Sequence, residues 1–180
     1  MVVILLGNGF EDIEALAPCD ILRRGGLKVV LAGVNGDIIT SGRGVAVKAD
    51  CTVHDVDINT VAQLVIPGGM GGVESISNSP AAMDLIKAAA EKGIPTAAIC
   101  AGPTILAGLG LLKGKQAVCH PDCREGFDCG EYIDAPVVKD GSTITARAAG
   151  ASLDFGFAIL ESLTDKQTAD TVAKGMCHAR

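Results

Sequence analysis

One cysteine stands in a sequence setting that suits nucleophilic chemistry. Cys100 follows the apolar run 94–97 and lies between Ala98 and Gly102, in the order small–x–Cys–x–small. That order is typical of the sharp strand-to-helix turn called a nucleophile elbow, where bulky neighbours would clash. Residues 102–107 are predicted to begin a helix, and the N–H groups at a helix N-terminus stabilise a thiolate. We therefore expect an activated nucleophile rather than one of the buried, inert cysteines found in many cores.

A carboxyl group that could share a proton with this sulfur is expected at Glu14. The start of the first predicted helix carries Glu11, Asp12 and Glu14. Negative charge is favoured at a helix N-terminus, which accounts for Glu11 and Asp12. Glu14 lies between Ile13 and Ala15, so it could face a crevice instead. A carboxyl buried beside a thiolate has a raised pKa, so it can stay protonated and donate a hydrogen bond to sulfur.

Backbone N–H groups around the cysteine could bind a developing negative charge. Gly68 and Gly69 follow the apolar residues 63–66, and adjacent glycines let N–H groups turn into a crevice as an oxyanion hole. A second donor would be the N–H of Ala101, the residue after the nucleophile. The loop 67–72 lacks the Lys-Ser/Thr of a phosphate loop, and no dinucleotide fingerprint follows it. We therefore expect no nucleotide site.

The general base for Cys100 is less clearly marked. His120 directly follows the predicted strand 116–119, which puts it at a strand end, although a surface histidine before Pro121 would look the same. Arg43 stands between two glycines, where it could hold an anionic group or remain a solvated loop residue. Both residues stay candidates.

A cluster of metal-binding residue types needs a separate interpretation. It consists of Cys119, His120, Cys123 and Cys129. Its spacing is irregular, and no second Cys-x-x-Cys pair accompanies it, so a structural zinc site is not expected. These sulfurs are interpreted as thiols prone to oxidation.

An alternation of strands and helices would position these residues. Short apolar runs bounded by glycine loops predict buried strands, and apolar residues at helical spacing predict helices between them. The order indicates an α/β fold with an open, doubly wound, mostly parallel sheet, in which ligands bind where loops leave the carboxyl ends of the strands. The loops 7–13 and 67–72 should therefore meet the elbow in one crevice. The predicted strands are residues 2–6, 28–34, 63–66, the run into Cys100, and 116–119; the helices are 11–24, 80–92, 106–112, 151–163 and 165–176; hairpins pair 38–40 with 45–47 and 137–139 with 142–146.

Length and composition bound the class of protein. One domain over residues 1–180 is expected, and 48% hydrophobic residues with only 3% aromatic ones indicate an aliphatic core. A net charge of −6 without a basic cluster counts against nucleic-acid and anionic-membrane partners. No apolar run approaches a membrane span and no leader is recognisable, so we expect a cytoplasmic protein whose seven cysteines are thiols.

Several motifs together resemble those of the ThiJ/PfpI superfamily, in particular the branch of the parkinsonism-associated protein deglycase and bacterial YajL. The similarity covers nearly the whole chain. It implies a flavodoxin-like fold, related to class I glutamine amidotransferases, and a homodimer. The matching motifs are Gly9-Phe10-Glu11-Asp12-Ile13-Glu14, Asp20-Ile21-Leu22-Arg23-Arg24-Gly25-Gly26, Val65-Ile66-Pro67-Gly68-Gly69, Ala97-Ala98-Ile99-Cys100-Ala101-Gly102-Pro103-Thr104, His120-Pro121 and Lys139-Asp140-Gly141.

The resemblance also implies roles for individual residues. Cys100 would be the nucleophile or the site of oxidation, with Glu14 as its protonated partner. The protease-like branch has a histidine directly after the cysteine, and Ala101 at that position argues against a peptidase. Met70 replaces a polar asparagine of the deglycase, and residues 148–152 replace its Gly-Pro-Gly-Thr-Ser segment, so the pocket is expected to differ. The remaining expected roles are backbone donation by Gly69 and Ala101, substrate contact by Gly68, Arg43 and Met70, an auxiliary role for His120, and approach of Arg24 to the site of a neighbouring subunit.

These residues predict a cysteine-dependent enzyme that needs neither a metal nor an organic cofactor. Cys100 would add to glyoxal or methylglyoxal to give a hemithioacetal, and Glu14 and His120 would move protons until a 2-hydroxy acid leaves. Such an enzyme is a glutathione-independent glyoxalase, and with glycated amino acids as substrates it is a protein deglycase. One alternative is an oxidative-stress sensor or chaperone whose cysteine oxidises to sulfinate. A weaker one, suggested by the ThiJ name, is a role in thiazole monophosphate or thiamine metabolism.

Overall fold

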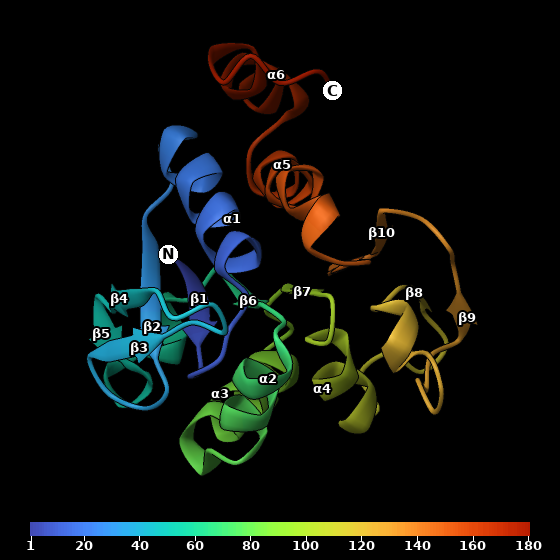
Figure 1. Ribbon diagram of the computed structural model, residues 1–180. Coiled ribbons are helices and arrows are strands. Elements are labelled where there is room, and N and C mark those ends of the chain that lie inside the picture. Colours follow the sequence, from blue (N-terminus) through green and yellow to red (C-terminus); the bar gives the residue numbers. More distant parts are fainter.

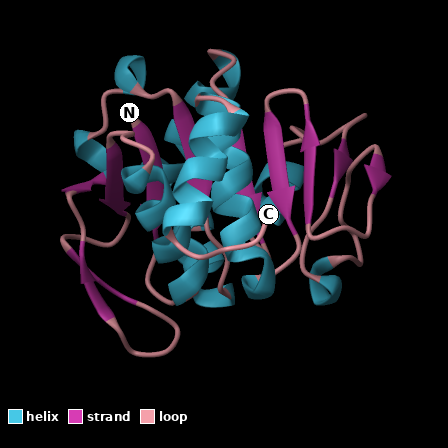
Figure 2. Ribbon diagram, turned by 90° about the horizontal axis from the view of Figure 1, so that it is seen from above, coloured by secondary structure: helices cyan, strands magenta, loops and turns pink.

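A seven-stranded sheet forms the centre of the computed structural model, which describes all 180 residues (Figure 1). Its strands are β1 (Val2–Leu6), β2 (Val29–Gly33), β5 (Cys51–Thr52), β6 (Gln63–Ile66), β7 (Thr96–Ile99), β10 (Val137–Asp140) and β11 (Thr143–Ala146). They lie in the order β10-β11-β7-β6-β1-β2-β5. All neighbours run parallel except β10 and β11, which form an antiparallel hairpin at one edge (Figure 2).

The central strands are buried on both faces, which explains their continuous apolar sequences. Every residue of β1 is at most 2% exposed. Val3 and Leu5 belong to one hydrophobic core, whereas Ile4 and Leu6 belong to the other. Alternate side chains of a strand point to opposite faces, so a strand covered on both sides must be apolar throughout.

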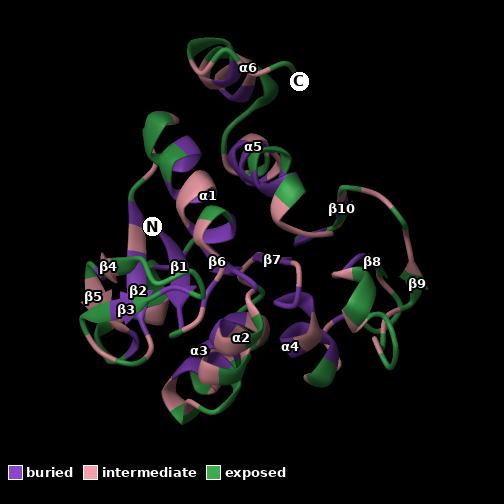
Figure 3. Ribbon diagram, in the orientation of Figure 1, coloured by how far each residue is buried: buried purple, intermediate pink, exposed green.

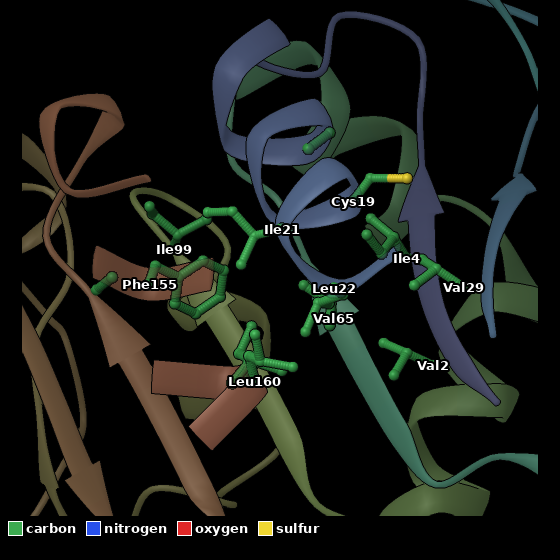
Figure 4. Packing of buried hydrophobic residues seen from close by; sticks show 14 of the residues in the cluster. Val2, Ile4, Cys19, Ile21, Leu22, Val29, Val65, Ile99, Phe155 and Leu160 are labelled. Atoms are coloured by element: carbon green, nitrogen blue, oxygen red, sulfur yellow. The ribbon is translucent and has the colours of Figure 1, made fainter. Parts of the chain in front are cut away.

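Helices cover both faces of the sheet. On one face lie α1 (Asp12–Arg24), α5 (Ser152–Leu163) and α6 (Lys166–Gly175), and on the other lie α2 (Met70–Ser77), α3 (Pro80–Glu91) and α4 (Pro103–Gly108). The buried residues lie between these layers (Figure 3), and the core under α1 and α5 is built from aliphatic side chains and Phe155 (Figure 4). None of the helices combines the length and the apolar character needed to cross a membrane.

The close packing of α1 on α5 depends on one glycine. A Cβ at Gly156 would lie 2.7 Å from Ile21 Cδ1 and 3.1 Å from Pro18 Cα, closer than side chains normally approach. Because α1 is held in this way, its N-terminal turn has a fixed position above the carboxyl ends of the strands.

Two small sheets lie outside the central one. The antiparallel hairpin β3 (Ile38–Thr40) and β4 (Ala46–Lys48) is tied to the loop after β1, because Gly9 N–H donates to Thr40 O and Gly42 N–H donates to Phe10 O, both at 2.8 Å. The strands β8 (Gln116–Ala117) and β9 (Glu131–Tyr132) pair in parallel. They belong to residues 116–135, called the outer segment below, which also contains a 3₁₀ helix at Pro121–Cys123.

The expected α/β fold with a mostly parallel sheet is confirmed. The prediction that residues 67–72 form a loop is wrong in part. Helix α2 begins at Met70, within that predicted loop. The glycines that suggested a loop serve close packing instead: a Cβ at Gly72 would lie 2.7 Å from Phe10 Cα.

Two further predictions are wrong in their bounds. The helix predicted over 106–112 is α4, which begins at Pro103 and ends at Gly108, and Gly110 with φ +72° then reverses the chain. The strand predicted over 116–119 is only β8, and it pairs with β9 rather than with the central sheet. Local apolar pattern does not reveal which strand a short segment pairs with.

Candidate active site

The turn after β7 holds Cys100 in strained backbone. Its φ is +64°, and the left-handed region costs a non-glycine residue on the order of 1–3 kcal/mol. The Cys100 N–H donates to Ala146 O at 2.9 Å, and the Gly102 N–H donates to Ile99 O at 2.9 Å. The Cys100 carbonyl in turn accepts from the His120 N–H at 2.8 Å. Surrounding hydrogen bonds therefore fix the half-buried cysteine in the geometry of a nucleophile elbow.

Glu14 is fully buried next to this turn, although its side chain is ionisable. Its Oε2 accepts a hydrogen bond from Gly68 N–H at 2.9 Å, and its Oε1 has no nitrogen or oxygen partner. The Glu11 carboxyl caps α1 by accepting from Glu14 N–H at 3.0 Å, which fixes the first turn. Burial raises the pKa of Glu14 to about 7, and its hydrogen bond with Cys100 offsets only part of that rise. Below neutral pH the carboxyl is therefore protonated.

The same carboxyl acts on the thiol. Burial and then the negative charge of Glu14 raise the pKa of Cys100 to about 12, while the N–H groups of Gly69 and Ala101 lower it by less. The prediction that a helix N-terminus holds Cys100 as a thiolate stays a prediction: α4 has only six residues, and burial raises the pKa of the thiol by more than the backbone donors lower it.

The two groups ionise as a pair that shares one proton. When that proton resides on Glu14, the carboxyl no longer repels a thiolate and can donate a hydrogen bond to it. The singly charged pair is the state that can hold a thiolate at Cys100.

The approach of the two groups requires a glycine at position 68. A Cβ there would lie 2.5 Å from Glu14 Oε2 and 2.6 Å from Cys100 Cβ, so any other residue would push the pair apart. Gly69 follows with φ +84°, a conformation that turns its N–H toward the sulfur at low steric cost.

A pocket of about 330 Å³ is lined by Gly69, Arg43 and Met70, among other residues, whereas Cys100 and Glu14 do not line it. The Met70 side chain is 70% exposed at its rim. Asp12 also lines the pocket; its Oδ1 accepts from Ser41 Oγ at 2.7 Å, which ties the β3–β4 hairpin to the start of α1. Two of the predicted substrate-contact residues, Arg43 and Met70, thus line one pocket, whereas the third, Gly68, lies against Glu14 and Cys100.

His120 and Arg24 are placed differently. The His120 backbone touches Cys100, but its Nδ1 accepts from Asp122 N–H at 3.2 Å and serves the turn of the outer segment. The Arg24 side chain is 52% exposed and pairs with Asp20 at 2.7 Å. It lies ten residues along α1 from Glu14, roughly 15 Å at the rise of an α-helix, so it does not reach the site of its own chain.

Long-range contacts supply what local reasoning missed. The Ala146 carbonyl that holds the elbow comes from β11, which pairs with β7 in parallel, and no nearby motif marks it.

The cluster of Cys119, His120, Cys123 and Cys129 is not arranged as a metal site. No group of three or more His, Cys, Asp or Glu side chains in the chain is arranged to hold a metal ion.

The fold and this geometry define a class: an α/β protein with a cysteine at a nucleophile elbow and a buried carboxyl as its partner. The chain belongs to the DJ-1/PfpI family, whose model matches residues 1–162. The resemblance inferred from the motifs is thereby confirmed.

Individual relatives match over almost their whole length. The chain is 35% identical over 177 residues to protein dj-1beta of Drosophila melanogaster, covering 97% of this chain and 95% of the relative. It is 29% identical over 180 residues to the glutathione-independent glyoxalase DJR-1.2 of Caenorhabditis elegans, covering 99% and 96%. Among solved structures, oxidized Toxoplasma gondii DJ-1 superposes with a TM-score of 0.95 at 32% identity, covering 99% and 98% of the two chains.

Proposed function

We propose that this chain is a glutathione-independent glyoxalase that converts 2-oxoaldehydes such as methylglyoxal into 2-hydroxy acids, and that it acts on glycated amino acids by the same chemistry. The observation that carries the proposal is the pairing of Cys100 with the buried Glu14, whose pKa burial raises to about 7. A relative that bears the name of a glutathione-independent glyoxalase supports it. Ala101, where a peptidase of this superfamily would have histidine, speaks against peptide hydrolysis.

The first step forms a bond between the Cys100 sulfur and the aldehyde carbon. The thiol proton passes through Glu14 to the carbonyl oxygen, which gives a hemithioacetal. The N–H groups of Gly69 and Ala101 lie at the sulfur and could bind the oxyanion while it forms.

The second step moves a proton from the former aldehyde carbon to the neighbouring ketone carbon. Glu14, as a carboxylate, takes the proton from the first carbon and returns it to the second, while the hydroxyl proton of the hemithioacetal passes to the former ketone oxygen. These two proton transfers leave a 2-hydroxy thioester on Cys100. Water then cleaves the thioester, so that the 2-hydroxy acid leaves and the thiol is restored. Overall, one water is added and no electrons are exchanged with another molecule. His120 acts as an auxiliary group that supports the elbow from its carbonyl side.

A homodimer belongs to the same proposal. The apolar residues Ile13, Val45 and Met70 are 50%, 48% and 70% exposed, which suits burial against a second copy. Arg24 would then approach the site of the neighbouring subunit.

A second function is favoured by one observation, the oxidized state named for the Toxoplasma gondii neighbour. A sulfinate at Cys100 would accept hydrogen bonds from the protonated Glu14 and from the two backbone donors, and the protein would act as an oxidative-stress sensor.

Purified protein with methylglyoxal and no glutathione tests the first function, with lactate measured as the product. We expect lactate in amounts equal to the methylglyoxal consumed. Intact-mass analysis after mild peroxide tests the second. Sulfinate at Cys100 together with negligible lactate would refute the glyoxalase function and support the oxidative-stress sensor.

A further inference from the structure

A second group of thiols lies in the outer segment. Cys119 is fully buried, whereas Cys123 and Cys129 are half-buried. Burial, and then the nearby Cys123 and Cys129, raise the pKa of Cys119 to about 12, so the three thiols share one neighbourhood. Neither the DJ-1-type site nor the proposed reaction uses them.

One carbonyl oxygen brings two of these residues together. His120 O accepts from Cys119 Sγ at 3.4 Å and from Cys123 N–H at 2.8 Å. The 3₁₀ helix Pro121–Cys123 folds the chain back, so Cys123 returns toward Cys119. Tyr132 OH donates to Cys119 O at 3.3 Å and holds the turn from the other side.

We propose that Cys119 and Cys123 form a second oxidation site, which closes to a disulfide when the protein meets a peroxide. A disulfide needs Cα atoms within about 7 Å, and the proposal rests on the shared His120 O, which lies 3.4 Å from Cys119 Sγ and 2.8 Å from Cys123 N. The peroxide reacts first with Cys123, because this cysteine lines an open pocket of about 330 Å³ together with Thr104 and Phe127, whereas Cys119 is fully buried.

The reaction needs only the peroxide as oxidant. The Cys123 sulfur attacks one peroxide oxygen, the O–O bond breaks, and a sulfenic acid and one water result. The Cys119 sulfur then attacks the Cys123 sulfur; the S–S bond forms, the S–O bond breaks, and the leaving hydroxide takes the Cys119 proton as a second water. Two thiols are oxidised by two electrons in total, and one peroxide is reduced to two waters.

The bond would lock the turn that carries His120, whose N–H donates to Cys100 O at 2.8 Å. The second site thus lies next to the elbow but does not depend on the chemistry of Cys100. For this reason its test uses the Cys100→Ser protein, in which the proposed enzyme and the proposed sensor are both silent.

Tryptic peptides separate the possible products. Cleavage after Lys115, Arg124 and Lys139 leaves Cys119 and Cys123 together in peptide 116–124 and Cys129 in peptide 125–139. After hydrogen peroxide and alkylation of the denatured protein, we expect peptide 116–124 to be lighter by two hydrogens and to take up alkylating reagent only after reduction. Full alkylation of both cysteines would overturn the proposal, as would a link between the two peptides.

Matched variants complete the experiment. In the same background, Cys129→Ser should leave the internal disulfide unchanged, and Cys123→Ser should leave Cys119 open to alkylation after denaturation. Cys123 is the preferred variant because it is only half-buried, so the fold tolerates its loss better than that of the buried Cys119. A disulfide that disappears in Cys129→Ser would contradict the assigned pair.

Discussion

The crevice at Cys100 and the outer segment (residues 116–135) are neighbours, joined by the hydrogen bond from His120 N–H to Cys100 O, but they are held in different ways. The crevice lies at the ends of β1, β6 and β7, whose residues are buried. The outer segment has two strands of two residues each, and many of its side chains are exposed.

The two regions differ in how tightly the surrounding structure fixes a functional side chain. In the crevice, the carboxyl of Glu14 is bound by a backbone N–H in a space that excludes even a methyl group at Gly68. In the outer segment, His120 makes its side-chain hydrogen bond within its own turn. Substitutions should therefore be costly in the first region and mild in the second.

The largest effect is expected from Cys100→Ser. Serine lacks the nucleophilic sulfur, so turnover of methylglyoxal should fall by more than about 10³-fold, as for loss of a covalent nucleophile. The measurement is lactate formed per minute, with circular dichroism to verify folding. Cys129→Ser in the outer segment is the control and should keep turnover within about twofold, as expected for a site away from the chemistry. Retained activity in Cys100→Ser would refute the glyoxalase.

The next effect concerns stability and pH. Burial raises the pKa of Glu14 from 4.5 to about 7, so the folded state binds this proton more tightly than the unfolded chain. The stabilising contribution is therefore complete below pH 4.5 and is lost as the pH rises through 7. Between pH 5 and 8, wild type should lose about 2–3 kcal/mol relative to Glu14→Gln, by urea unfolding. If the free energies of unfolding of the two proteins changed with pH in parallel, the pKa of Glu14 would not be raised in the folded state.

Gly68→Ala tests the steric side of the crevice. The added Cβ would meet Glu14 Oε2 at 2.5 Å, so we expect a loss of about 1–3 kcal/mol in the free energy of unfolding and a loss of turnover. Gly108→Ala is the matched control because a Cβ there meets nothing within 4 Å, and its effect should stay within about 1 kcal/mol. Equal effects of the two changes would remove the packing argument.

The same contrast explains how far the sequence could be interpreted. The elbow was predictable because the small residues around Cys100 carry a local signal, whereas the carboxyl partner was predictable mainly because residues 9–14 resemble a family motif. The pKa of Cys100 was not, since it depends on burial by distant elements. Two other features also depend on distant contacts and were missed: the pairing of β8 with β9, and the helix Met70–Ser77. Close packing on Phe10 stabilises that helix although its sequence is rich in glycine.

A smaller effect is expected in the reactivity of Cys100. The pair with Glu14 loses its first proton near pH 7, so alkylation of Cys100 by iodoacetamide should rise with pH around that value in wild type. In Glu14→Gln no carboxylate forms to raise the pKa of Cys100, so the rate should keep rising above pH 7 instead of levelling off as in wild type. At pH 8 it should exceed the wild-type rate by about tenfold, one pKa unit in the population of thiolate. The rate is measured by mass spectrometry on the Cys100 peptide. A rise that is unchanged in the variant would separate Glu14 from the thiol.

The smallest effect is expected from His120→Ala. Alanine keeps the backbone N–H that donates to Cys100 O, and the lost side chain served only the Asp122 N–H of its own turn. Turnover should therefore fall by less than about tenfold, below the 10²–10⁴-fold contribution of a positioned acid or base. Asp122→Asn is the control for the turn, because it keeps the backbone donor while removing the charge 3.7 Å from His120 Nδ1. A hundredfold loss in His120→Ala alone would show that this histidine takes part in the reaction, since no structural role described for its side chain could account for such a loss.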